Sequence, residues 1–364
     1  MLAGILLTGK TVKGHKERES SSGKEGAPLE HSIETRKVQK SGRGSTVISL
    51  PKVWVELTGL KPGDPVALQY QRDGSLLVSP KLVEKLARLQ VTIEIDTKRP
   101  QRTARQVIAA YLEGYNQIEL HSRGEMGTAV RQLLHDGVRK IIGLEIVEEG
   151  RDRIILLDLA SPSEFPMARG LRRMHLLTRA MCDDAIGAVL EVEPERVAVV
   201  LQRDDEVDRL YWLIVKQHHL VLRDPRFAAK IEMTAQRSLG FMLAARMFER
   251  VADHACTIAR SAADLKGALP KAIADGLKDA SDQALALLDR GFQSFVGDNP
   301  TDADEVIESV KPFEARVSSL RESIGGLKGR QAVALAYVLE SIERTGAYAT
   351  DIAELAINNS LAEK

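Results

Sequence analysis

The chain has 364 residues, with 51 Lys plus Arg and 51 Asp plus Glu, so its formal net charge is zero. This balance excludes a uniformly basic protein that coats nucleic acid, although it allows a local basic surface. An aromatic content of 4% and a charged content of 28% favour helices over an all-β sandwich. At about 150 residues per domain, we expect roughly two or three domains.

The two cysteines, Cys182 and Cys256, exclude a four-cysteine zinc site, and both lie in apolar helical patterns. We therefore expect buried free thiols in a reducing compartment. The sequence predicts no membrane insertion and no signal peptide, which indicates a cytoplasmic protein. Residues 8–33 are rich in Gly, Ser, Lys and Glu, so we expect residues 1–33 to form a disordered tail.

Residues 34–81 combine short strands with tight turns. A strand is predicted over 46–50, and a helix over 51–58 begins at Pro51 because proline is tolerated in the first helical turn. Asp73–Gly74 predicts a turn between two further strands. Two hairpins of this size bury little apolar surface by themselves, so we expect this region to dimerise.

Residues 85–160 alternate strands with helices, which indicates a small α/β domain. Ser122 and Glu125 form a capping box that predicts a helix from there to about residue 136. Glu149–Gly150 predicts a hairpin turn. The strands are predicted over 91–95, 118–120, 141–147 and 154–159, and the first helix over 101–113.

Residues 163–364 read as six helices, three in 163–266 and three in 268–364. The breaks between helices coincide with prolines or glycines at 193–194, 224–225, 267–270, 299–300 and 325–326. The segments Glu249–Ala255 and Glu343–Ala349 are similar, and each is followed by Ile-Ala. We interpret them as an internal duplication of a three-helix unit.

Five basic residues, with no acidic residue among them, gather between positions 36 and 52: Arg36, Lys37, Lys40, Arg43 and Lys52. The glycines at 42 and 44 allow the backbone to turn close to a ligand. A solvated hairpin with accidental charge and a surface that contacts DNA phosphates both fit these residues.

The segment from Arg36 to Asp64 resembles the AbrB/SpoVT swapped-hairpin DNA-binding domain. The resemblance implies an interlaced homodimer that contacts DNA through Arg36, Lys37, Lys40 and Arg43. Leu50 stands where that family usually has Ile. Relatives in antitoxins use the same fold to bind partners, so dimerisation without DNA contact stays open.

Four carboxylates lie on the apolar seams of two predicted helices, Asp204 and Asp208 on one and Glu249 and Asp253 on the next. Carboxylates facing a bundle interior are costly unless they are protonated, paired or bound to a cation. Two such pairs could bind a divalent or ferric ion through oxygen. The alternative is ion pairing with arginines on the same helices, which are Arg209, Arg246 and Arg250.

Residues 163–364 resemble PhoU, a family of phosphate-signalling regulators, through the duplicated Glu-Arg-x-x-Asp-His-Ala segment. The resemblance implies a metal motif, often for iron, which Asp204/Asp208 and Glu249/Asp253 match. In the second repeat Ala347 and Tyr348 replace the Asp and His, which puts a second metal site in doubt.

The fold expected from these segments is multidomain α+β: a small β swapped-hairpin domain, a small α/β domain and an all-α pair of three-helix bundles. An AbrB-like head with a PhoU-like tail is similar to archaeal PhoU-type regulators. The resemblance implies control of phosphate uptake by DNA binding and by contact with a phosphate transporter ATPase or a sensor kinase.

Two alternatives differ in class from a DNA-binding regulator. In the first, the chain is a scaffold that restrains the transporter ATPase, and its head only dimerises. In the second, it is a metal-dependent hydrolase that uses the carboxylates. The sequence contains no P-loop, no HExxH and no nucleophile–base arrangement, so we expect no enzymatic activity.

Overall fold

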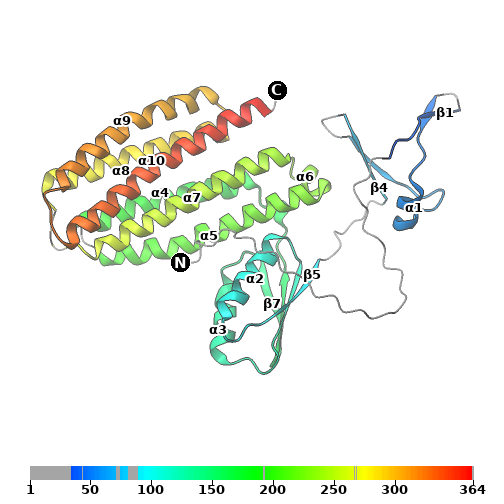
Figure 1. Ribbon diagram of the computed structural model, residues 1–364, viewed down its shortest axis with the longest axis horizontal. Coiled ribbons are helices and arrows are strands. Elements are labelled where there is room, and N and C mark those ends of the chain that lie inside the picture. Colours follow the sequence, from blue (N-terminus) through cyan, green and yellow to red (C-terminus); the bar gives the residue numbers. More distant parts are fainter. Residues whose placement is uncertain are drawn as a thin grey trace, which may run out of the picture. The chain divides into compact units, whose positions relative to one another are not determined.

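The computed structural model describes residues 34–362 except 43, 71–73, 81–88, 192, 266 and 268. It divides into two units, Met1–Leu86 and Ala87–Lys364 (Figure 1). The predicted disordered tail 1–33 lies outside the described residues. So do residues 81–88, where the predicted hairpin domain gives way to the α/β domain.

The N-terminal unit contains two antiparallel hairpins separated by a short helix; its described residues within 34–80 are called the hairpin unit below. Gly59, with a φ of 68°, ends the helix in a left-handed conformation that suits glycine. The predicted turn residue Asp73 lies outside the described part. The elements are β1 (Gln39–Ser41) with β2 (Ser45–Val47), α1 (Lys52–Thr58), and β3 (Ala67–Tyr70) with β4 (Leu76–Ser79).

The hairpin unit has no hydrophobic core within one copy of the chain. None of its described residues is buried, and Tyr70 is 87% exposed. The other exposed large apolar residues are Val38, Val47, Ile48, Leu50, Val53, Leu57, Leu68 and Leu76. Exposed apolar surface on this scale normally marks an interaction site.

The second unit begins with a two-layer α/β domain. Its sheet has the order β5-β6-β8-β7, in which β5 and β6 are parallel and the other pairs antiparallel. The helices α2 and α3 cover one face (Figure 1). The elements are β5 (Gln90–Glu94), α2 (Pro100–Leu112), β6 (Gln117–His121), α3 (Thr128–Arg139), β7 (Leu144–Glu149) and β8 (Arg153–Asp158).

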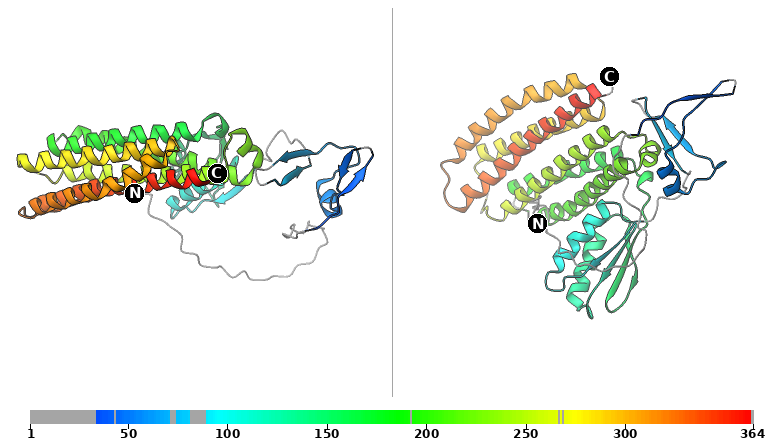
Figure 2. Two further views of the ribbon diagram at one scale, coloured as in Figure 1. Left: turned by 90° about the horizontal axis from the view of Figure 1, so that it is seen from above. Right: turned by 45° about the vertical axis from the view of Figure 1, so that its right-hand side comes forward.

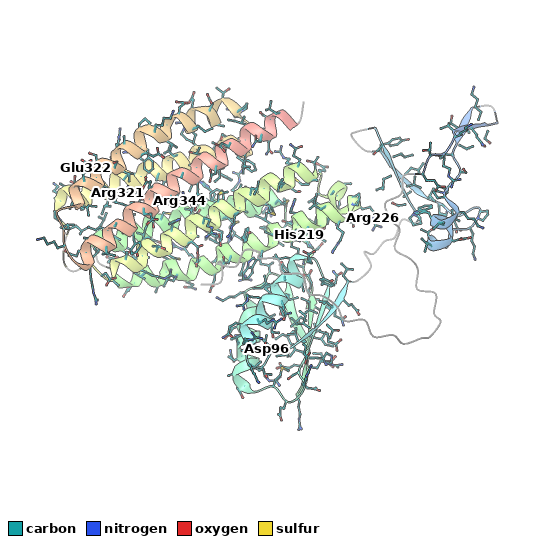
Figure 3. The ribbon with its side chains drawn as sticks, in the orientation of Figure 1. Asp96, His219, Arg226, Arg321, Glu322 and Arg344 are labelled. Atoms are coloured by element: carbon teal, nitrogen blue, oxygen red, sulfur yellow. The ribbon has the colours of Figure 1, made fainter. Side chains whose placement is uncertain are left out.

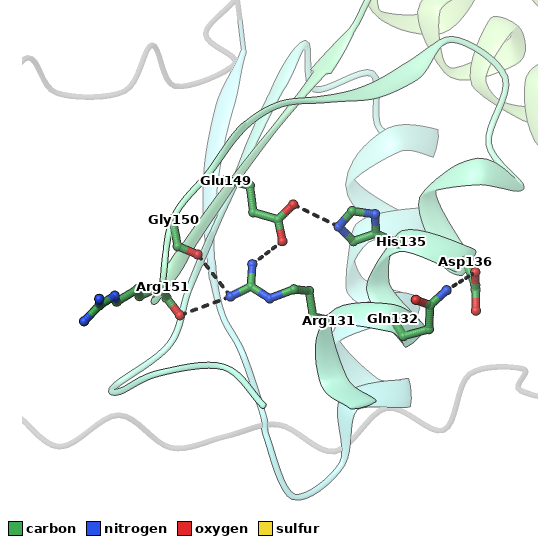
Figure 4. Close-up of polar contacts among 7 residues, drawn as sticks. All are labelled: Arg131, Gln132, His135, Asp136, Glu149, Gly150 and Arg151. Carbon is green, nitrogen blue, oxygen red and sulfur yellow. Dashed lines mark hydrogen bonds and ion pairs between the residues drawn. The ribbon is translucent and has the colours of Figure 1, made fainter. Parts of the chain in front are cut away.

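A polar contact fastens α3 to the turn between β7 and β8 (Figure 4). Arg131 forms an ion pair with Glu149 and donates to the carbonyl oxygen of Gly150 at 3.2 Å. His135 Nε2 lies 3.0 Å from the second carboxylate oxygen of Glu149. Arg131 and His135 together lower the pKa of Glu149, so the carboxylate holds the turn in its charged form.

The predicted capping box at Ser122 is wrong, because α3 begins six residues later. The Ser122 N–H donates to the Asp152 carbonyl at 2.7 Å, and Met126 N–H donates to the Arg151 carbonyl at 2.9 Å. Residues 122–126 therefore run along the β7–β8 turn, and Gly127 occupies the N-cap position. The predicted strand over 141–147 also starts later, at Leu144.

The remaining residues form six long helices that run side by side (Figures 1 and 2). The three-helix units share one continuous hydrophobic core. A short helix, α6, was not predicted; the Asp224 side chain caps it by accepting from the Arg226 N–H. A 3₁₀ turn (Pro162–Glu164) precedes α4 (Met167–Glu191), α5 (Pro194–Arg223), α6 (Pro225–Lys230), α7 (Ala235–Ala262), α8 (Lys271–Val296), α9 (Pro300–Ile324) and α10 (Arg330–Ala362).

The α/β domain packs against α5 of the bundle around a buried ion pair. Lys216 on α5 pairs with Asp158 at the end of β8, and each side chain is only 2% exposed. The Lys216 ammonium also lies 4.1 Å from the centroid of the Tyr111 ring. Trp212, one turn earlier on α5, packs against the α/β core, so the two parts share an interface with a charged centre.

The multidomain α+β class predicted from the sequence is confirmed. Cys182 and Cys256 are buried free thiols, as expected. Within the described ranges, no helix combines the length and apolar character needed to cross a membrane.

Candidate functional site

The first candidate site is the basic surface of the β1–β2 hairpin. Lys40 lies within β1 and Lys37 just before it, and both side chains are exposed. Arg36 forms an ion pair with Glu34, so part of its charge is neutralised. Gly42, with a φ of 63°, makes the turn, and the fourth predicted DNA contact, Arg43, lies outside the described residues.

The second candidate site is the set of four carboxylates on α5 and α7, called the carboxylate cluster below: Asp204, Asp208, Glu249 and Asp253. The two helices pack against each other along apolar residues such as Val207 and Ala252. Glu249 is buried, and the other three are half-buried. The heptad seam predicted for α5 is real, since Val200, Val207, Ile214 and Val221 are all buried.

Mutual repulsion and burial perturb the titration of the carboxylate cluster. Burial, reinforced by the other three carboxylates, raises the pKa of Asp208 to about 7. Burial also raises the pKa of Glu249 to about 7, against the opposing effect of Arg246. The pKa of Asp204 is raised by burial and by Asp253. Asp208 and Glu249 are therefore partly protonated near neutral pH.

Ion pairing accounts for two of the four carboxylates. Glu249 Oε2 lies 3.0 Å from Arg246 Nη1 and 3.9 Å from Arg250 Nε. Asp253 lies 3.8 Å from Arg250 Nη1. The Glu249 Oε2 atom nevertheless accepts no well-aligned hydrogen bond.

Cys256 lies beside the carboxylate cluster. Burial and the neighbouring Asp204 raise the pKa of its thiol to about 12, so this cysteine is a weak donor rather than a nucleophile.

In the second repeat, Arg321 and Arg344 (labelled in Figure 3) contact the residues that correspond to the motif. Arg321 on α9 pairs with Glu343 at 2.5 Å. Arg344 donates to the Tyr348 hydroxyl at 3.2 Å and lies 4.9 Å from its ring centroid. Tyr348 in turn packs 5.9 Å from the His254 ring of α7. The residues that replace the motif thus form part of the contact between the repeats.

In the arrangement that the structure describes, the carboxylate cluster does not form a ready-made metal site. Across the described residues, no group of three or more His, Cys, Asp or Glu side chains is placed to hold a metal. Arg246 and Arg250 lie beside Glu249 and Asp253 and already supply positive charge there. Metal binding at these residues stays a prediction.

The buried Lys216–Asp158 pair was not found by sequence reasoning. The two residues are 58 positions apart. The periodicity of the sequence does not show which helix packs against the end of the strand that carries Asp158. One signal was available, because Lys216 directly follows the largely apolar run Leu210–Val215. A lysine at such a position is rarely buried unless it is paired.

Comparisons with known families match both parts of the chain. The model of the PhoU domain matches residues 171–262. The model of the antidote-toxin recognition protein MazE, a bacterial antitoxin, matches residues 39–85.

The chain contains a PhoU domain, preceded by an N-terminal swapped-hairpin domain. Its PhoU domain match covers α5 and α7, which carry the carboxylate cluster.

Two solved structures are similar to part of this chain, and no match was found among curated proteins. The phosphate transport system regulatory protein PhoU from Streptococcus pneumoniae is 18% identical, with a TM-score of 0.45 over 52% of this chain and 91% of that chain. PhoU from Pseudomonas aeruginosa is 16% identical, with a TM-score of 0.46 over 54% of this chain and 96% of that chain.

Proposed function

We propose that this PhoU-type protein is a DNA-binding regulator of phosphate uptake and signalling. The observation that carries the proposal is the presence, in one chain, of a PhoU domain and an antitoxin-type domain whose hairpin exposes Lys37 and Lys40. Control by binding, rather than by catalysis, is the role that this pairing supports.

The DNA-binding form of the protein is a homodimer in this proposal. A single hairpin unit buries none of its described side chains, and its exposed apolar residues need a partner surface. Lys37 and Lys40 supply the positive charge, because Lys52 at the start of α1, although 88% exposed, lies 3.7 Å from the Glu56 carboxylate. Two copies double this positive surface, which suits the closely spaced phosphates of a DNA duplex.

Signalling between the two ends requires a ligand or partner that distinguishes two arrangements of the protein. A transporter ATPase or a sensor kinase that binds the PhoU domain would shift DNA occupancy only if its affinity differs between those arrangements. The phosphate-linked signal would thereby reach the promoter through a change in the populations of the two arrangements.

A second candidate function is a scaffold that restrains the transporter ATPase, with the hairpin unit serving only for dimerisation. The ion pair between Arg36 and Glu34 favours it, because an arginine neutralised by its own chain contributes less to phosphate binding. In this case the exposed apolar residues still explain the dimer, and Lys37 and Lys40 are solvated charges.

Fluorescence anisotropy with DNA from upstream of phosphate-transport operons, against a scrambled duplex at several salt concentrations, separates the two candidates. Each neutralised phosphate contributes about −0.9 to the log–log salt slope, so the Lys37→Ala/Lys40→Ala variant should reduce the slope by up to about 3.6 per dimer. Lys61→Ala, an exposed lysine elsewhere in the hairpin unit, serves as the control. If the dimer binds no DNA at low salt, the result would refute the DNA-binding function and favour the scaffold function.

A further inference from the structure

The two edges of the α/β sheet are built differently. The β7 edge carries Glu145, Glu148 and Glu149 and an irregularity in register between Ile146 and Glu148. Charged residues and bulges are the devices by which proteins prevent an edge strand from pairing with another chain. This edge is therefore protected against strand addition.

The β5 edge has one charged residue, Glu94 at its end, and no irregularity in register. The strand reads Gln-Val-Thr-Ile-Glu over Gln90–Glu94 and pairs regularly with β6 along its whole length. It contains no proline, lysine or bulge, and three β-branched residues occupy its centre. Among the described strands, β5 has a neighbour on one side only.

The backbone groups of alternate residues in β5 face its open side. Ile95 N–H donates to the His121 carbonyl, and Gln117 N–H donates to the Leu89 carbonyl, so the odd-numbered residues bond to β6. By the two-residue period of a strand, the N–H and C=O groups of Gln90, Thr92 and Glu94 point outward. Unpaired backbone groups in such a row form a template for another strand.

We propose that β5 pairs in an antiparallel manner with β5 of a second copy of this chain, which joins the two sheets across the dimer. The proposal rests on the homodimer of the proposed function. Only ten residues, 80–89, separate β4 of the hairpin unit from β5, a tether of at most about 36 Å. Dimerisation through the hairpin units therefore holds the two β5 strands at high effective concentration.

The residues of β5 are complementary to themselves in one register. With the two-fold axis at Thr92, Thr92 faces the partner's Thr92, and Gln90 faces the partner's Glu94. Threonine pairs across strands are favourable. Within one copy the Gln90 amide donates to Gln117 and Glu94 pairs with Arg123, so each glutamine meets a carboxylate whose charge is already balanced. A register centred on Glu94 would place two carboxylates opposite each other, which is destabilising. Sequence and backbone thus favour the same pairing.

Single-cysteine cross-linking in the full chain tests this register. Thr92→Cys places two thiols directly across the axis, so a bis-maleimide spanning about 8 Å should link the copies, since directly opposed residues lie about 5.5 Å apart. Gln90→Cys has the same tether, but its two copies lie about 14 Å apart along the strands. We expect linkage at Thr92→Cys to be at least tenfold faster. The native chain provides a blank because Cys182 and Cys256 are buried.

A second variant tests the energetic consequence. Thr92→Lys places two ammonium groups opposite each other and should raise the dimer dissociation constant at least tenfold in analytical ultracentrifugation. Glu145→Lys on the protected β7 edge should leave it unchanged. Equal cross-linking rates at Thr92→Cys and Gln90→Cys, or an unchanged dissociation constant for Thr92→Lys, would overturn the proposal.

The outcomes separate this proposal from the proposed function. Loss of DNA binding in Lys37→Ala/Lys40→Ala together with absent cross-linking at Thr92→Cys would refute only the β5 pairing. Efficient cross-linking at Thr92→Cys in a dimer that binds no DNA would support the β5 pairing and refute the DNA-binding function.

Discussion

Removing one partner of the buried Lys216–Asp158 pair should destabilise the interface between the α/β domain and the bundle. Each side chain is 2% exposed, so either single substitution, Lys216→Met or Asp158→Asn, leaves an uncompensated charge away from water. Breaking such a pair costs about 3–5 kcal/mol. Burial already lowers the pKa of Lys216, with Asp158 opposing the shift, which shows how much this ammonium depends on its partner.

The double variant Lys216→Met/Asp158→Asn should recover most of that loss. Replacing a whole buried pair by uncharged groups is often nearly neutral, so we expect the double variant to lie within about 1–2 kcal/mol of the native protein. A double-mutant cycle then gives a coupling energy of at least about 2 kcal/mol. An exposed pair at the same interface, Lys140–Asp205, with side chains 44% and 50% exposed, should cost about 1 kcal/mol or less when broken.

Urea unfolding followed by tryptophan fluorescence measures these effects at the interface itself. The chain has two tryptophans, and a Trp54→Phe background leaves Trp212, which packs between α5 and the α/β core. Single-variant losses below about 1 kcal/mol, or strictly additive losses in the double variant, would refute the view that the pair is buried and coupled.

Three further predictions concern the bundle. Because the pKa of Asp208 is raised to about 7, the native state binds more protons than the unfolded state between about pH 4 and 7, so stability falls as pH rises through this range. At about 1.4 kcal/mol per pH unit between about 4 and 7, Asp208→Asn should therefore raise the free energy of unfolding at pH 8 by up to about 4 kcal/mol and change it little at pH 4. An equal gain at both pH values would contradict this. If the metal prediction holds, elemental analysis of the purified protein should find iron or a divalent ion that Asp208→Asn removes and Glu343→Gln retains. Gly291→Ala should destabilise by about 1–3 kcal/mol in thermal unfolding, because an added Cβ would lie 2.7 Å from the Ala349 carbonyl oxygen, whereas Gly326→Ala, with nothing within 4 Å, should be neutral.

The long helices were predictable because residues at their own ends determine where they begin and stop. Proline opens α5, α8 follows directly on Pro270, and Asn299 caps α9 through its own side chain. The capping box at Ser122 failed for the opposite reason, since the Ser122 N–H that a helix start would leave free is bonded to a residue 30 positions away. Local rules hold where local hydrogen bonds decide the structure.

The carboxylate cluster was likewise predictable only where local sequence signals decide the structure. Its placement on α5 and α7 follows from heptad spacing, and the structure brings all four groups within electrostatic reach of one another. The choice between a cation and arginine as counter-charge depends on side-chain packing between helices. Sequence reasoning left both open, and Arg246 and Arg250 lie beside Glu249.

The coreless hairpin unit has a consequence for the amount of protein in a cell. Because one copy buries none of its described side chains, the unit cannot gain folding free energy before it meets a second copy, so folding and association are a single concentration-dependent event. The folded fraction then rises steeply with expression level. Under the proposed DNA-binding function, gene dosage would thus set a threshold for promoter occupancy, and a modest change in synthesis or degradation would shift that occupancy without any ligand.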